Sequence, residues 1–441
     1  MGRATLIKSV ALSTPLYTMS SFKLPKKICQ DLDAVVWKFW WNPRKEGNCY
    51  HTPLAWNELC RPQSHGGLGF RSFESFNEAM IAKLVWWVLS SQDSFCVKVL
   101  RAKYKVGNKW LHSVPTKSAS FSWRGIESAR VLISKGGCKL VGNGNNILVW
   151  DEPWVPELPN FCSQPRVADN SPCMAVSQRM TPDKSGCDIS KLLLYFDSDT
   201  VQAIQNIPRW GSNQEDRWIW LKTGNGELTV KSAYKEIYNG DEGSQVCQIM
   251  GQIWKTIIHA RLQMLLWRVA SGILPTMDLL AQFASEGDMQ CVVCGHEMES
   301  TIHVLWDCSL ARAIWFGCIW SLRADRFQIT SLKELVEAII YPPNELELGD
   351  DLKEKFILLG ALIVDQLWKC CNLIRFEGSQ VDVEKILRNI WALEAEHWNS
   401  SGGNVSLLRS LKTAVHWQSK SQRLVLQKLI AMLRWVLNFL L

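Results

Sequence analysis

The sequence feature that most constrains this chain is a set of four metal-ligating side chains near residue 300. Cys291 and Cys294 are separated by two residues, and His303 and Cys308 follow within a short downstream window. Thiolate and imidazole are ligands that tetrahedral zinc prefers, and paired cysteines with two further ligands are typical of a zinc site. Three sulfurs and one nitrogen leave no open position for water. We therefore expect a structural zinc rather than a catalytic one.

Two other interpretations of these residues stay open at this point. Two core cysteines beside a surface histidine would give the same pattern. So would a redox dithiol, although such dithiols usually lie where a strand meets a helix rather than in a hairpin. His296 competes with His303 for the nitrogen position, but it lies so close to Cys294 that it would complete a tetrahedron poorly. A module this small has little core, so metal binding would decide whether it folds.

Basic residues are concentrated in the first third of the chain. Residues 1–150 carry 21 Lys and Arg against 8 Asp and Glu, whereas the remainder carries 28 against 34. A local cluster comprises Lys98, Arg101, Lys103, Lys105 and Lys109. A basic surface suits nucleic acid, because each neutralised phosphate releases condensed counterions. The alternative is an ordinary solvated surface.

Fifteen cysteines could belong to a secreted disulfide scaffold, but the sequence lacks a secretory signal at its start. We therefore expect reduced thiols inside a cell. The sequence begins Met1-Gly2-Arg3-Ala4-Thr5 and shows no secretory signal there. Cys29, Cys96 and Cys318 have apolar neighbours and are expected to be small core residues. We also expect no membrane partner, because the apolar run 356–364 is short and the run 424–441 is interrupted by charges.

The hydrophobic pattern predicts an α+β fold that is mostly helical, with small antiparallel β-hairpins and the Cys3His zinc module. Helical spacing of apolar residues is expected in 5–40, with a proline break, and in 73–89, 232–238, 254–270, 301–322, 331–340, 352–376, 383–397 and 405–441. Hairpins are expected at the glycine turn 142–146 before 147–150, and at Asn225-Gly226 between 218–222 and 228–230.

Four segments follow from these patterns. We predict a basic helical segment at 1–110, a hairpin-rich connection at 111–240, a zinc-binding module at 241–330 and a helical segment at 331–441. Tryptophans on apolar helix faces, such as Trp40 and Trp86, are expected to lie in cores rather than to stack on nucleic-acid bases.

Several different short motifs follow one another along roughly residues 1–320. They are Gly2 to Val10 with Pro15, Tyr17 and Met19; Gly66-Gly67-Leu68-Gly69, Asn77 and Ala82-Lys83-Leu84; Gly142-Asn143-Gly144 with Trp150, Asp151 and Trp154; and Trp254, Leu266-Trp267-Arg268, Leu274-Pro275-Thr276, Cys291, Cys294, Glu299, His303, Cys308 and Trp315. In this order they resemble the polyprotein of plant LINE-type (non-LTR) retrotransposons, from the end of the polymerase palm through its zinc-binding domain.

The chain also departs from that family. A reverse transcriptase needs a Tyr-x-Asp-Asp turn to hold its metal ions, and the sequence has none. Asp350-Asp351 is expected to start a helix instead. The stretch after residue 378 is too short for the ribonuclease H domain that often follows in the family. Ala260-Arg261 and Cys371-Asn372 stand where the family usually has Pro-Lys and Arg-Asn.

The resemblance and the residues together predict a protein without catalysis, stabilised by zinc and binding RNA or DNA, a remnant of the retrotransposon polyprotein. The family implies a place in the nucleus. Two alternatives stay open: a zinc-stabilised scaffold that binds other proteins through its apolar surfaces, and a pseudogene product without selected function.

Overall fold

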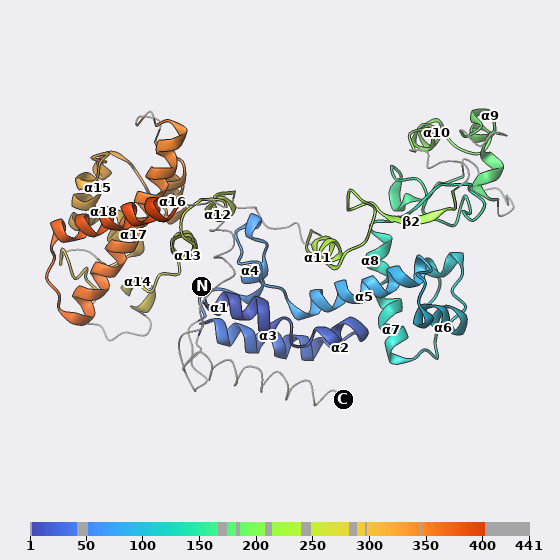
Figure 1. Cartoon of the computed structure of the whole chain (residues 1–441), viewed down its shortest axis with the longest axis horizontal. Coiled ribbons are helices and arrows are strands. Elements are labelled where there is room, and N and C mark those ends of the chain that lie inside the picture. The colour runs from blue at the N-terminus through green and yellow to red at the C-terminus, as the bar shows by residue number, and fades with distance from the viewer. Residues whose placement is uncertain are drawn as a thin grey trace. The chain divides into compact units, whose positions relative to one another are not determined.

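The computed structural model of the chain describes residues 2–41, 52–165, 174–181, 186–207, 214–239, 248–281, 289–295, 298–343, 346 and 348–401, without the side chains of 350, 351, 400 and 401. These residues form two compact units. Within the described ranges, the first unit takes 2–11, 34–70 and 248–401, and the second takes 12–33 and 71–239 (Figure 1). The four-segment division of the sequence stays a prediction. The expected helix at 405–441 lies outside the described residues.

Apart from one isolated bridge between Gln290 and Met298, the regular elements in the described part of the first unit are helices. Its elements are α1 (Gly2–Leu6), the π-helical turn η1 (Ile7–Ala11), α4 (Trp56–Cys60), α12 (Gln248–Ile253), α13 (Ala260–Ala270), α14 (Met277–Leu280), the π-helical turn η7 (His303–Asp307), α15 (Ser309–Gly317), α16 (Leu332–Ile340), α17 (Asp350–Glu377) and α18 (Val383–Ser401). The start of α16 is set locally, because Ser331 and Glu334 form a reciprocal capping box. The end of α17 is set by Gly378, whose φ of +66° a side chain with a Cβ adopts only with strain.

Helix α17 is long and apolar enough to cross a bilayer over Leu352–Glu377. However, 61% of its most apolar window is buried inside the protein, and the core helices of soluble proteins meet the same criteria. Its buried Asp365 forms ion pairs with Arg261 at 2.7 Å and Lys369 at 2.8 Å. These contacts fit a core helix. The absence of a membrane partner stays a prediction.

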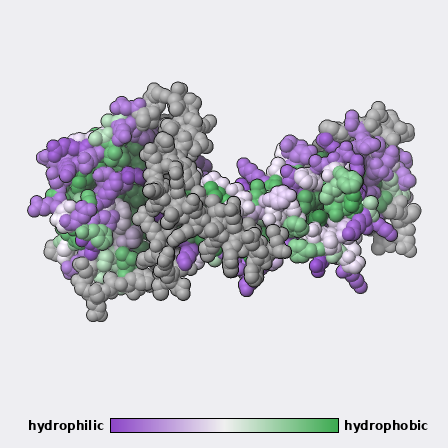
Figure 2. All heavy atoms as spheres, turned by 60° about the horizontal axis from the view of Figure 1, so that its bottom comes forward, coloured by the Kyte–Doolittle hydropathy of each residue, from purple (hydrophilic) through white to green (hydrophobic). Residues whose placement is uncertain are grey.

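The second unit is built around α5, which is apolar on most of its circumference. Its elements are α2 (Leu16–Ser21), the first half of α3 (Lys26–Trp41), α5 (Phe73–Leu89), α6 (Phe95–Lys103), α7 (Phe121–Ser128), α8 (Arg130–Ser134), β1 (Gly137–Leu140), α9 (Ile189–Leu193), α10 (Ser198–Gln205), β2 (Arg217–Trp220) and α11 (Val230–Asn239). A helix that is hydrophobic on several sides is buried on several sides. Accordingly α7, α8, β2 and α11 contribute to one core with α5, in which Trp86, Trp123 and Trp220 are buried. Hydrophobic residues also reach the surface among hydrophilic ones (Figure 2).

The two strands pair antiparallel, with Gly137 opposite Trp220 and Leu140 opposite Arg217. The fold class is confirmed, since the described chain is mostly helical with this small sheet and a Cys3His cluster. Of the hairpin expected at Asn225-Gly226, the first strand forms as β2, but the prediction of a second strand is wrong. Gly226 does turn the chain, with φ +73°, but Val230 begins α11 instead of a strand.

The glycine turn at 142–146 does not form a hairpin either. The carboxylate of Asp216 accepts hydrogen bonds from the amides of Gly142 at 2.8 Å, Gly144 at 2.9 Å and Asn146 at 2.9 Å. Three amides are thereby satisfied by one side chain, so the loop wraps around a carboxylate rather than joining a strand ladder.

Two further expectations need correction. The helix expected at 254–270 is shorter, because residues 254–259 are not helical and α13 begins only at Ala260, where the ring of His259 accepts a hydrogen bond from the amide of Arg261. All cysteines that the structure describes are free thiols. Cys29 and Cys318 are buried as expected, but Cys96 is exposed on α6.

Candidate metal centre

Cys291 and Cys294 lie on a tight turn whose flanks meet at one antiparallel bridge, between Gln290 and Met298. The amide of Gly295 donates to the carbonyl of Cys291 at 2.8 Å, and Gly295 has a φ of +67°. This left-handed conformation favours glycine and lets the chain reverse directly after the second thiol. The turn, and not a strand-to-helix junction, carries the two cysteines.

His303 and Cys308 flank the π-helical turn η7. The amide of Cys308 donates to the carbonyl of His303 at 2.8 Å, which closes the wide turn. The hydroxyl of Ser300 accepts from the amide of His303 at 3.2 Å and fixes the start of the turn. Two local turns thus supply two ligands each.

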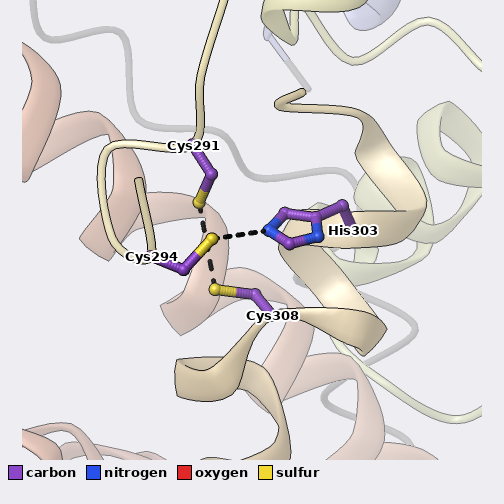
Figure 3. Close-up of side chains that lie close together, drawn as sticks. All are labelled: Cys291, Cys294, His303 and Cys308. Atoms are coloured by element: carbon purple, nitrogen blue, oxygen red, sulfur yellow. Dashed lines mark hydrogen bonds between the residues drawn. The ribbon is translucent and has the colours of Figure 1, made fainter. Parts of the chain in front are cut away.

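The four side chains point toward one another (Figure 3). Their donor atoms all lie within 4.8 Å of one another. The sulfurs of Cys291 and Cys308 are 3.9 Å apart, and the sulfur of Cys294 lies 3.3 Å from Nε2 of His303. Zinc bonded tetrahedrally at its usual lengths separates two sulfurs by about 3.8 Å, and a sulfur from a nitrogen by about 3.6 Å. The donor set therefore fits one small cation.

Burial and proton sharing also connect the four groups. His303 is 5% exposed, so the interpretation as two core cysteines beside a surface histidine does not hold. A hydrogen bond with Cys291 lowers the pKa of Cys308 to about 7, while the same bond, together with burial, raises the pKa of Cys291 to about 12. Burial alone would lower the pKa of His303, but hydrogen bonds to Cys291 and Cys294 outweigh it and raise that pKa. A bound cation would replace these shared protons.

Helix α17 supports the cysteine turn from outside the ligand set. Arg375 forms an ion pair with Glu299 at 2.6 Å, with both side chains nearly buried, and donates to the carbonyl of Gln290 at 3.1 Å. On the other side, the hydroxyls of Thr276 and Thr301 lie 3.0 Å apart. The sequence analysis did not find Arg375, because its spacing from the cysteines carries no local signal. The rival ligand His296 lies outside the described residues.

Residues 228–315 match the family of zinc-binding domains in reverse transcriptase, and this range includes all four donor residues. The chain is 30% identical to an uncharacterised mitochondrial protein of Arabidopsis thaliana over 145 residues, which cover 33% of this chain and 94% of that protein. The chain belongs to the family of plant retrotransposon polyproteins. A second relative, an Arabidopsis thaliana protein provisionally named a ribonuclease H protein, is 28% identical over 417 residues, or 92% of this chain. The chain spans 65% of that relative's length.

The predicted nucleic-acid cluster of this retrotransposon protein lies in the second unit, on α6 and the segment after it. Two of its lysines face carboxylates: Lys98 lies 2.6 Å from Asp93, and Lys109 lies 2.7 Å from Asp151. Both lysines are more than half exposed, so these pairs hold the ammonium groups only weakly.

The other three cations of the cluster differ in their surroundings. The guanidinium of Arg101 donates to the carbonyl of Val88, and its partial burial lowers its pKa. The ammonium of Lys103 lies 5.4 Å from the centre of the Tyr104 ring. Lys103 and Lys105 are exposed. The structure therefore places Arg101 partly in the fold and leaves the lysines at the surface.

Proposed function

We propose that Cys291, Cys294, His303 and Cys308 bind a structural zinc ion. The observation that carries this proposal is the convergence of their four donor atoms within 4.8 Å. Zinc supplies no reaction at such a site, because four protein ligands leave no position for water or substrate. Its role is to connect the cysteine turn to η7 where little apolar packing does so.

Metal analysis of the purified chain tests this directly. We expect one zinc per chain, and loss of that zinc in Cys294→Ala. Cys318→Ala is the control, since Cys318 is a free thiol of the same unit that lies outside the cluster. A wild-type chain without stoichiometric metal contradicts the proposal, as does a Cys294→Ala chain that keeps it.

We further propose that the chain is a LINE-type retrotransposon remnant that binds RNA or DNA in the nucleus without catalysing a reaction on it. Support comes from the exposed lysines of the cluster and from the basic excess of residues 1–150. The sequence has no Tyr-x-Asp-Asp turn, so we assign it no polymerase activity. Ribonuclease H is part of a relative's name, and we propose binding alone for this chain.

Fluorescence anisotropy with labelled RNA and DNA oligonucleotides at several salt concentrations tests the binding. Affinity should fall steeply with salt, because binding releases counterions. The pair Lys103→Gln and Lys105→Gln should weaken binding to all sequences and reduce the salt slope by about one per lost phosphate contact. Lys333→Gln is a control, since Lys333 is an exposed lysine of the first unit. No affinity for either nucleic acid at low salt contradicts this proposal.

A second candidate function is protein binding through apolar surface on the first unit. Phe316 and Ile319 at the end of α15 are 55% and 54% exposed, and Phe376 on α17 is 76% exposed. Exposed apolar side chains mark protein interfaces where they form a contiguous patch. A pull-down in which proteins remain bound after nuclease treatment, and are lost in Phe316→Ala with Phe376→Ala, favours this function over nucleic-acid binding.

A further inference from the structure

Two aromatic side chains lie together at the surface of the second unit, on elements far apart in the sequence. Phe22 follows α2 and is 40% exposed, and Phe121 begins α7 and is 53% exposed. Their ring centres are 6.5 Å apart, with 32° between the ring planes. A pair of large rings in contact with each other but still open to solvent is costly to hydrate, so an occupant that covers both would be stabilised.

The backbone that carries Phe22 is held by hydrogen bonds from a buried side chain. Asn77 of α5 is buried, and its side-chain amide donates to the carbonyls of Met19 and Phe22 at 2.8 Å each. Its oxygen accepts from the amide of Leu24 at 2.7 Å. The segment that carries Phe22 therefore loses little backbone freedom when the ring binds a ligand, which favours affinity.

Cations flank the aromatic pair. The ammonium of Lys23 lies 2.9 Å from the hydroxyl of Ser128, at the end of α7. Arg124 is exposed and lies one helical turn after Phe121, on the same side of α7. The carboxylate of α7, Glu127, is buried and is bonded to Thr116, so it does not face these cations.

The aromatic pair is also continuous with the basic cluster of α6. The hydroxyl of Tyr104 donates to the hydroxyl of Ser120 at 3.0 Å, directly before Phe121. The Tyr104 ring stacks on Trp123 of α7, with centres 4.1 Å apart. Lys103, which lies over the Tyr104 ring, is therefore close to the start of α7.

We propose that Phe22 and Phe121, with Lys23 and Arg124, form a site at which single-stranded nucleic acid stacks its unpaired bases. Aromatic faces accept any base, and adjacent cations hold the phosphates that follow it. A duplex hides its base faces in the stack, so only its phosphates could use this surface. The inference rests on the proposed nucleic-acid binding and narrows it to the strand state that is bound.

The test compares binding of the full chain to a labelled single-stranded oligonucleotide and to a blunt hairpin duplex, both at low salt. Phe22→Ala and Phe121→Ala should each weaken single-strand binding about tenfold, consistent with typical base stacking on an aromatic ring. Duplex affinity should stay unchanged, and Phe121→Tyr should retain single-strand binding. Phe316→Ala is the matched control, because this ring of the first unit is 55% exposed and lies outside the site.

Each outcome separates this inference from the broader proposal. Equal losses on single strand and duplex, or no loss on either while binding persists, overturn the stacking site but leave nucleic-acid binding intact. A wild-type chain that binds neither probe overturns both. Loss of binding to phosphatidylserine vesicles in the two variants, with unchanged single-strand binding, assigns the rings to a membrane surface and overturns the inference.

Discussion

The cysteine turn 289–295 in the first unit and the α5 core in the second unit differ in how many apolar side chains they bury. In the cysteine turn 289–295, Cys291 is the buried side chain. In α5, by contrast, buried groups occur along the whole helix, including Phe73, Ile81, Val85 and Trp86. The cysteine turn therefore has few apolar contacts of its own and would depend on the proposed metal ligands, whereas α5 is held by many apolar contacts.

Removal of the metal should have the largest effect on stability. Chelation, or Cys294→Ala, should release the cysteine turn, since comparable zinc peptides gain an apparent 10–16 kcal/mol or so from the ion at neutral pH. Hydrogen exchange should speed up in 289–308 while the amides of α5 keep their protection. If α5 loses protection equally, the two regions are not held independently and the comparison fails.

Trp220→Ala should destabilise the α5 core and leave the metal centre intact. Trp220 is fully buried and lies edge-on to Trp86 with ring centres 6.3 Å apart, so its truncation leaves a cavity that should cost about 3–5 kcal/mol. Denaturant unfolding followed by exchange in α5 measures the loss. Zinc content should stay at the wild-type level. Trp391→Ala, which removes a 43% exposed ring from α18, is the control and should change little.

Arg375→Ala tests how far the first unit relies on polar groups beside the ligands. The side chain of Glu299 is only 6% exposed. Removing Arg375 therefore leaves a buried carboxylate without this cation. Removing one partner of a buried ion pair costs about 3–5 kcal/mol, and we expect a loss of stability at the lower end of that range. Zinc should then dissociate at a lower chelator concentration. Lys369→Ala serves as the comparison, since Asp365 keeps its contact with Arg261. Equal effects of the two changes would show that the position of Arg375 beside the turn does not matter.

Lys109→Gln should have the smallest effect on stability. Its pair with Asp151 is largely exposed, and such pairs contribute about 0–1 kcal/mol. Thermal unfolding should shift little, while affinity for nucleic acid falls. A stability loss as large as that of Arg375→Ala would mean that polar contacts matter equally in both units.

Local sequence signals predicted the elements that are determined locally. The bounds of α5 match the expected 73–89, because Ser72 caps its start and apolar residues occur along its whole length. The four donor residues were also found from their spacing, since each pair lies on one short turn. The break between α12 and α13 was missed, because the apolar pattern continues through the region where the backbone turns.

The sequence by itself determined which residues can form helices, that three thiols and an imidazole are close enough along the chain to meet, and that the N-terminal third is basic. Tertiary structure alone decided that β1 pairs with β2, that Asp216 holds the 142–146 loop, that Arg375 supports the cysteine turn and that Phe22 meets Phe121. The physical reason is that each of these contacts joins residues far apart in sequence. Such pairs leave no periodic pattern, and they form because the packed helices have already met the entropic cost of closing the intervening loops.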